Sequence, residues 1–500
     1  MKSFYSLHFF VLLNNVIQGR IHGFAIFGAK KSKPTSAFTK DVNTCNAENE
    51  VRLHMSSSVA SEEINTNIRK VKDLCPPSWD DLTSHVDEMK ENDESAVNEN
   101  LTPLVTLYRD TNGWCPFCER VWFALKIKNI PYRETLISLY DKPKWFTDIV
   151  PTGLVPVVLI HSDTIQKSRE EDGKDERKAN PARTLIWESL DILKALDENF
   201  PDTPKLIYED DENYMKGREV MNKLTSTGFA FIYNSRNETL TMGEKKMQKL
   251  QFEENLDALE KFLGLHNGSP FFLNEISGLD VEAVPTLERW RYQVHLTKNM
   301  DMMEGRPNLQ KWFEAMDKYE AYIERVSGDE YSWAAVASTF LKVFGTGKDG
   351  PSEETKDAID KAEMEAEKLR SKFEQHPSDS GLFSEDLLKK GRLEAAIKLI
   401  NNHEAIVKDC TNADPKSQQD LGRAADSKNA DWMLRIITAV LLNIDMNSSD
   451  DDTCADINFG DASVAAKTVA SRLCVPRDMG APAAAVLRYE LSSVASELRN

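Results

Sequence analysis

The sequence predicts a mixed α/β domain followed by two helical regions. Short apolar runs typical of strands lie mainly between Leu104 and Trp187, whereas after Pro201 apolar residues recur at helical spacing. A break rich in Gly, Pro, Ser and charged residues, 345–353, then divides the helical part. The chain has 500 residues, more than one hydrophobic core usually organises, so several domains are expected.

Within the α/β part, strand and helix signals follow one particular order. Asn112-Gly113 breaks the chain after the first apolar run, and Phe117, Val121 and Leu125 then share one helical face. Strands are expected at 104–108, 132–139, 155–160 and 184–187, with a helix after the first strand and an amphipathic helix at 188–199. The order βαβ followed by ββα is that of a thioredoxin-like domain.

The remaining segments are interpreted by composition and period. The charged stretch 161–183 is too polar for burial and is expected to form a surface loop. Ser277 and Asp280 form a variant of the capping box, which predicts a helix start. Further helices are predicted at 215–224, 247–263, 283–296, 309–323, 384–400, 431–442 and 462–473.

These signals divide the chain into five parts. The α/β domain is expected at 102–202, an all-helical domain at 203–345, and a helical extension at 351–500 whose role the sequence does not define. Residues 41–101 are polar, poor in aromatics and predicted to be a disordered linker.

The first 40 residues have the composition of a targeting presequence. An apolar stretch at 4–17 is followed by four lysines, at positions 30, 31, 33 and 40, with no acidic residue before Asp41. This arrangement resembles the bipartite plastid presequence of algae with complex plastids. Plastid targeting is therefore expected, with the secretory pathway or another organelle as the alternative.

Charge and hydropathy narrow the classes of partner. The chain carries 62 Lys and Arg against 81 Asp and Glu, a net charge of -19, which opposes binding to a phosphate backbone and predicts no nucleic-acid partner. No apolar run reaches the roughly 18 residues of a membrane span.

Two of the seven cysteines, Cys115 and Cys118, have a spacing that indicates chemistry. A cysteine just before a helix faces free backbone N-H groups and the positive end of the helix dipole, which favour the thiolate. Pro116 suits the first helical position because no N-H is needed there. Cys115 is therefore the predicted nucleophile, and Cys118 could resolve a mixed disulfide formed on it.

Two other interpretations of the pair were weighed. A zinc site needs about four ligands, and no second Cys pair or close Cys and His cluster supplies them, so no metal is predicted. Two buried structural cysteines would also explain the spacing. The context of strand, loop and helix favours a redox site.

Four segments in order carry a family resemblance. They are residues 114–120, 141–146, 151–157 and 188–189, and they resemble the glutathione site of cysteine-type glutathione transferases, especially the omega class. The resemblance covers about 104–344 and implies a thioredoxin-like domain joined to an all-α transferase domain. It departs from the omega pattern at Cys118, since that class commonly has one cysteine at this turn, and at the insertion 161–183.

The resemblance implies glutathione as co-substrate and assigns residues to it. Val155 precedes a proline, Pro156, that is cis in this fold and lets the backbone pair with an extended peptide. Glu188 and Ser189 would receive the γ-glutamyl ammonium and carboxylate groups. Lys142 would meet the glycyl carboxylate, and Phe117 belongs to the same binding set.

The function expected from this site is glutathione-dependent thiol transfer or reduction by Cys115, acting on a small or protein disulfide or on dehydroascorbate. The alternatives are conjugation of glutathione to electrophiles and a non-enzymatic scaffold that recruits a partner through the helical extension. The resemblance is also compatible with a homodimer.

Overall fold

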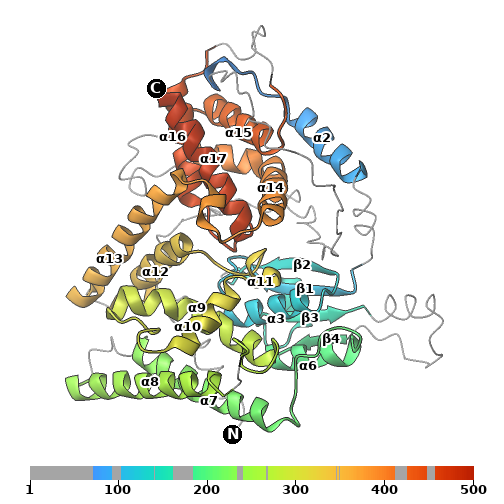
Figure 1. Ribbon diagram of the computed structural model, residues 1–500. Helices are drawn as coiled ribbons and strands as arrows, with labels where there is room; N and C mark the ends of the chain where they lie inside the picture. Colours follow the sequence, from blue (N-terminus) through green and yellow to red (C-terminus); the bar gives the residue numbers. More distant parts are fainter. Residues whose placement is uncertain are drawn as a thin grey trace, which may run out of the picture.

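The computed structural model describes the greater part of the chain, shown in Figure 1. The described residues are 71–92, 103–139, 141–161, 184–232, 240–265, 268–344, 346–347, 350–411, 425–446 and 456–499. The predicted presequence 1–40 and most of the predicted loop 161–183 lie outside them. Within these ranges, no helix has the length and apolar character needed to cross a membrane.

The first domain contains a four-stranded sheet in the order β2-β1-β3-β4, which Figure 1 shows at the right of the view. The strands are β1 (Val105–Asp110), β2 (Tyr132–Ile137), β3 (Val157–Ile160) and β4 (Thr184–Trp187). β1 and β2 are parallel, whereas β3 is antiparallel to both β1 and β4. The predicted βαβ and ββα order is therefore confirmed.

Helices α3 (Pro116–Ile127) and α6 (Ser189–Asn199) connect and cover this sheet, as predicted, and α4 (Lys144–Ile149) adds a short helix after β2. α3 is apolar around most of its surface, with Val121, Phe123 and Leu125 fully buried. Such a helix packs on more than one side. α3 contacts both α6 of its own domain and α9 of the next.

The second domain is helical. The helices predicted at 215–224, 247–263 and 283–296 are present with longer bounds, and a further helix at 330–344 was not predicted. The helices are α7 (Glu212–Ile232), α8 (Met242–Leu263), α9 (Gly278–Lys298), α10 (Pro307–Met316), α11 (Glu320–Ile323) and α12 (Glu330–Phe344). The capping box at the start of α9 is formed as expected. The carboxylate of Asp280 accepts from the backbone N-H of Ser277, and the hydroxyl oxygen of Ser277 accepts from the backbone N-H of Leu279. The single helix expected at 309–323 is instead two, since Asp317 to Tyr319 form a turn between them.

The C-terminal region forms a helical bundle with its own hydrophobic core, at the opposite end of Figure 1 from α7 and α8. A short two-stranded sheet, β5 (Thr346–Gly347) and β6 (Gly350–Pro351), precedes it. Its elements are α13 (Glu353–Arg370), the 3-10 turns Ser371–Glu374 and Pro377–Ser380, α14 (Glu385–Thr411), α15 (Ser427–Leu441), α16 (Phe459–Arg472) and α17 (Ala481–Arg499).

One part of the predicted linker 41–101 departs from expectation. A 3-10 turn (Val71–Asp73) and helix α2 (Trp79–Asn92) are ordered elements that pack on the C-terminal bundle. Leu82 and Val86 are buried there, and the indole of Trp79 donates to Asp431 at 2.8 Å. The segment is too polar to fold alone, so tertiary packing decides its structure.

A buried ion pair joins α3 to the second domain. The guanidinium of Arg289 on α9 lies 2.7 Å from the carboxylate of Glu119 on α3, and the hydroxyl of Tyr322 on α11 donates to Glu119 at 3.1 Å. Burial lowers the pKa of Arg289, but the carboxylates of Glu119 and Glu288 outweigh burial and raise it. The contacts of Glu119 therefore fix the helix that begins after Cys115 against two helices of the other domain.

Breaking this pair should be costly. We expect Glu119→Ala to lower the free energy of unfolding by about 3 kcal/mol, because removal of one partner leaves Arg289 charged and buried. Urea denaturation followed by tryptophan fluorescence measures the shift in midpoint. Lys144→Ala removes the exposed Lys144–Asp148 pair and is the control, with an unchanged midpoint expected. An equal shift in both variants would contradict the assignment.

Candidate active site

Four chain segments meet at one edge of the sheet. In the strand register Tyr108 of β1 faces Val157 at the start of β3, and Val157 faces Trp187 at the end of β4. The ends of β1 and β2 also lie together, since Asp110 faces Ile137. The segments that follow or precede these positions carry every predicted site residue. The topology therefore brings residues up to about 70 positions apart to a single edge.

Cys115 occupies the position expected of the nucleophile. It is the N-cap of α3, in extended conformation, and Pro116 is the first helical residue. Its thiol is free and 5% exposed, and its sulfur lies 4.0 Å from the carbonyl oxygen of Val155. The sulfur thus faces both the helix N-terminus and the backbone that precedes β3.

Cys118 lies inside the first turn of α3 and is also a free thiol, 1% exposed. Burial, and next the hydrogen bond and charge of Cys115, raise the pKa of Cys118 well above the ordinary value. A carboxylate oxygen of Asp110 and the two sulfurs all lie within 4.8 Å of one another. In the described part of the chain this set has three donors, one fewer than the four of tetrahedral zinc sites.

Glu188 and Ser189 form the junction between β4 and α6. Glu188 is exposed and adopts φ +76°, a conformation that costs a residue with a side chain on the order of 1–3 kcal/mol and recurs at functional sites. Ser189 is the first residue of α6, is 6% exposed, and its Oγ accepts from Arg120 at 2.9 Å. Because Arg120 occupies an oxygen lone pair, the serine hydroxyl hydrogen is free to donate elsewhere.

The other predicted residues lie around the same edge. Val155 and Pro156 are joined by a cis peptide bond, as expected, and both are buried before β3. Phe117 lies on α3 beneath the guanidinium of Arg120, 5.6 Å from the ring centroid. Lys142 precedes α4, is partly buried and forms no ion pair with the described residues, and burial lowers its pKa.

The C-terminal extension forms one wall of the site. Gly113, in the loop before Cys115, has φ +66°, and a Cβ placed on it would lie 3.2 Å from Pro476 and 3.4 Å from the backbone N of Arg477. The carbonyl of Pro476 accepts from Arg325, and Trp114 packs in a small cluster with Cys474. The loop before Cys115 therefore contacts a segment more than 350 positions away in the chain.

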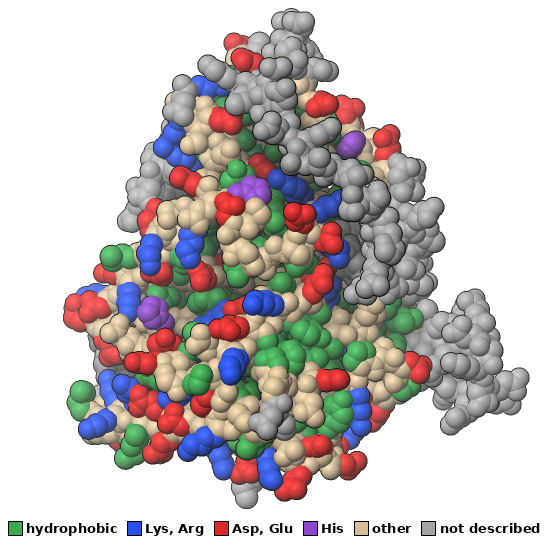
Figure 2. All heavy atoms as spheres, in the orientation of Figure 1, with side chains coloured by type: hydrophobic (Ala, Val, Ile, Leu, Met, Phe, Trp, Pro, Cys, Tyr) green, Lys and Arg blue, Asp and Glu red, His purple; other side chains and the backbone are tan. Residues whose placement is uncertain are grey.

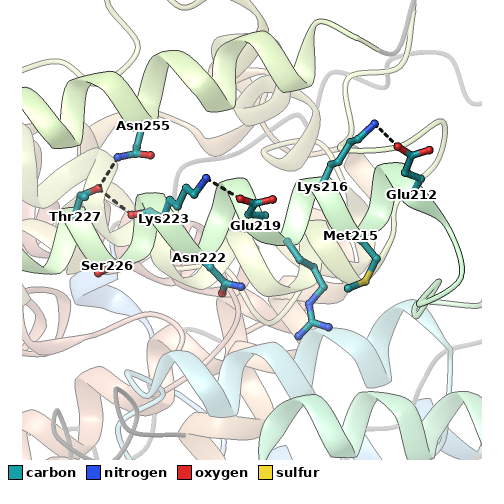
Figure 3. Close-up of a pocket in the computed structure, with 10 residues that line it drawn as sticks. Glu212, Met215, Lys216, Glu219, Asn222, Lys223, Ser226, Thr227 and Asn255 are labelled. Carbon is teal, nitrogen blue, oxygen red and sulfur yellow. Dashed lines mark hydrogen bonds and ion pairs between the residues drawn. The ribbon is translucent and has the colours of Figure 1, made fainter. Parts of the chain in front are cut away.

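A groove on the described surface lies away from these residues. It runs along α7, has a volume of about 850 Å³ and shares none of the predicted site residues (Figure 3). Its charged side chains pair along the helix, with Lys216 on Glu212 and Lys223 on Glu219, both at 2.7 Å. Paired, exposed charges are typical of a solvated helix face, so we assign this groove no ligand.

The charged side chains of the surface are of both signs. On the face shown in Figure 2, Lys and Arg side chains are interspersed with Asp and Glu and do not gather into a stripe. On this face the distribution agrees with the acidic composition of the chain.

Two residues of the site were missed by sequence reasoning. Arg120 contacts Ser189 and the carbonyl oxygen of Glu282, which places a cation behind the serine. Asp110 ends β1 and lies against both cysteines. An acidic residue at the end of an apolar strand, five positions before a cysteine, was the available signal.

Comparison with known proteins agrees with this geometry. Residues 114–199 match the model of the glutathione S-transferase N-terminal domain, and residues 242–315 match that of the C-terminal domain. Protein IN2-1 from Zea mays is 30% identical over 237 residues, covering 46% of this chain and 84% of that protein. The chain belongs to the glutathione S-transferase family.

Two relatives from Arabidopsis thaliana are also similar to this chain. Glutathione S-transferase L1 is 29% identical over 242 residues, 48% of this chain and 87% of the relative. Glutathione S-transferase L2, chloroplastic, is 29% identical over 212 residues, 42% of this chain and 62% of the relative. The transferase domain matched at 114–199 contains every site residue predicted from the sequence, and the two matched domains end before the helical extension begins.

Proposed function

We propose that this protein is a glutathione-dependent thiol transferase or reductase in which Cys115 is the nucleophile. The observation that carries the proposal is the meeting of Cys115, Val155-Pro156, Ser189 and Lys142 at one edge of the sheet. Membership of the glutathione S-transferase family supports glutathione as the co-substrate. The nature of the N-cap residue supports thiol chemistry, because a thiolate at a helix N-terminus is stabilised by backbone N-H groups.

The charged groups of glutathione complement the side chains at this edge of the sheet. Its glycyl carboxylate would pair with Lys142, a cation without an anionic partner among the described residues. Its γ-glutamyl carboxylate would accept from the Ser189 hydroxyl and the N-terminus of α6, with Arg120 behind the serine. The exposed carboxylate of Glu188 would pair with the γ-glutamyl ammonium group. Phe117 and the backbone at Val155 would flank the cysteinyl part.

The proposed reaction transfers glutathione from a mixed disulfide of the substrate to Cys115, and then to a second glutathione. The Cys115 thiolate attacks the glutathione sulfur of a mixed disulfide, so that Cys115 becomes disulfide-bonded to glutathione and the substrate leaves as a thiolate. A second glutathione thiolate then attacks this bond, which releases glutathione disulfide and restores the Cys115 thiolate. The substrate is released as a thiol and one free glutathione is consumed, which forms glutathione disulfide with the glutathione taken from the substrate. Dehydroascorbate is an alternative oxidised substrate.

Replacement of the nucleophile is the direct test. We expect Cys115→Ser to reduce the rate of mixed-disulfide reduction by the full-length protein by about 1,000-fold or more, because a serine hydroxyl is not a thiolate at neutral pH. Cys410→Ser is the control and should retain full rate, since Cys410 is buried in α14 and burial raises its pKa to about 12. Full activity in Cys115→Ser would refute the mechanism.

The lysine contact predicts an effect on glutathione binding. We expect Lys142→Met to raise the KM for glutathione about tenfold with little change in kcat, because one charge-assisted hydrogen bond is lost. Lys144→Met is the matched control two positions away, since Lys144 is exposed and already pairs with Asp148 at 2.7 Å. Steady-state kinetics with varied glutathione distinguishes them. An equal rise in KM for both variants would assign Lys142 only a general surface charge.

Plastid targeting is part of the same proposal. The composition of residues 1–40 supports it, and the name of one relative includes the word chloroplastic. A fusion of residues 1–60 to a fluorescent reporter should accumulate in the plastid of algal cells. A reporter that stays in the cytosol would contradict this routing.

A further inference from the structure

Asp110 is a buried carboxylate whose role the proposed reaction leaves open. It is 0% exposed at the end of β1, next to the loop that carries Cys115. One carboxylate oxygen accepts from the backbone N-H of Trp114 at 2.9 Å, whereas Oδ1 has no hydrogen-bond partner among the described residues. A buried polar atom without a partner is costly, and such atoms recur at functional sites.

Neighbouring cations do not neutralise Asp110. The side chain of Arg109 turns to Glu134, at 2.6 Å, and reaches only the carbonyl oxygen of Asp110. Arg289 pairs with Glu119, the other acidic group that faces this carboxylate. In the described part of the chain, the remaining titratable groups beside Asp110 are the thiols of Cys115 and Cys118.

The Cys118 thiol must lose its proton before it can attack a disulfide, and the Asp110 carboxylate can accept that proton. Burial raises the pKa of the Cys118 thiol well above its ordinary value, so Cys118 carries a proton at neutral pH. A thiol attacks a disulfide only after it loses that proton. Residues three apart at a helix start share one face, and the two sulfurs already lie within 4.8 Å.

We propose that Asp110 accepts the proton of the Cys118 thiol and thereby enables Cys118 to resolve the disulfide between Cys115 and glutathione. The inference rests on the proposed function, because it requires that disulfide to form first. Asp110 is then a catalytic residue, and the site follows a dithiol route.

The step balances without an outside oxidant. The Cys118 proton moves to Asp110, and the new thiolate attacks the Cys115 sulfur, so that a Cys115–Cys118 disulfide forms. The bond between Cys115 and glutathione breaks, and the glutathione thiolate leaves with the proton from Asp110. In this step Cys118 is oxidised, the glutathione sulfur is reduced, and Cys115 stays disulfide-bonded. Two further glutathione molecules then reduce the internal disulfide.

A two-phase experiment on the full-length protein tests the proposal. The protein is mixed with a glutathionylated peptide, quenched in acid at intervals and analysed by mass spectrometry. The first phase is the appearance of the glutathione adduct on Cys115, and the second is its loss as the internal disulfide forms. In Cys118→Ser the adduct should persist.

Asp110→Asn is the informative variant, because the amide oxygen can still accept from Trp114 but cannot take up a proton. We expect the first phase to stay within about twofold of the wild-type rate and the second to slow about 100-fold, as for loss of a general base. The second-phase rate of the variant should then rise about tenfold per pH unit from pH 6 to 8, because hydroxide must form the Cys118 thiolate.

The outcomes are distinguishable. An unchanged second phase in Asp110→Asn would overturn the proton-transfer role and leave the proposed function intact. Equal slowing of both phases would make Asp110 structural and overturn the proposal. The absence of any adduct on wild-type Cys115 would overturn both proposals. If Asp110→Asn does not fold, Asp110→Ala is used in its place. We expect added formate to restore the second phase of Asp110→Ala. Failure of formate to restore it would overturn the proton-transfer role.

Discussion

The buried ion pair between Glu119 and Arg289 is the constraint on which the site depends. α3 must present Cys115 at its first turn and also pack against two domains. Glu119 is one turn beyond Cys115, and its N-H donates to the Cys115 carbonyl at 3.0 Å. Since Arg289 and Tyr322 hold Glu119 from the second domain, they also fix the direction in which the helix N-terminus points. The position of the nucleophile is thus a property of the interface between domains.

The loop before Cys115 is constrained from the other side by the C-terminal extension. Pro476 and Arg477 lie against Gly113, where no side chain could be accommodated without movement. Arg289 also donates to the carbonyl of Trp114 at 2.9 Å. The extension therefore contributes to the shape of a site to which it supplies no predicted glutathione contact.

The thiol pair combines two environments that are only about one helical turn apart. Cys115 is the N-cap of α3, and its sulfur lies 4.0 Å from the carbonyl oxygen of Val155. Cys118 lies within the helix, where burial favours the thiol. In the proposed resolving step, the Asp110 carboxylate beside both sulfurs takes up the proton of the buried thiol. The proximity of Asp110 to the thiols arises because the end of β1 meets the start of α3, and the spacing of the cysteines alone does not reveal it.

The sequence by itself determined the strand order, the helical second domain and the principal site segments, because apolar period, turn residues and capping signals are local. It also identified Cys115, Lys142 and Ser189 as candidate site residues through the segments that surround them. Only the tertiary structure decided that α2 folds onto the distant bundle, that Arg120 lies behind Ser189 and that Asp110 faces the thiols. These features depend on contacts between residues far apart in the chain, and neither a charge on a helix nor an acid at a strand end reveals its partner until the packing is known.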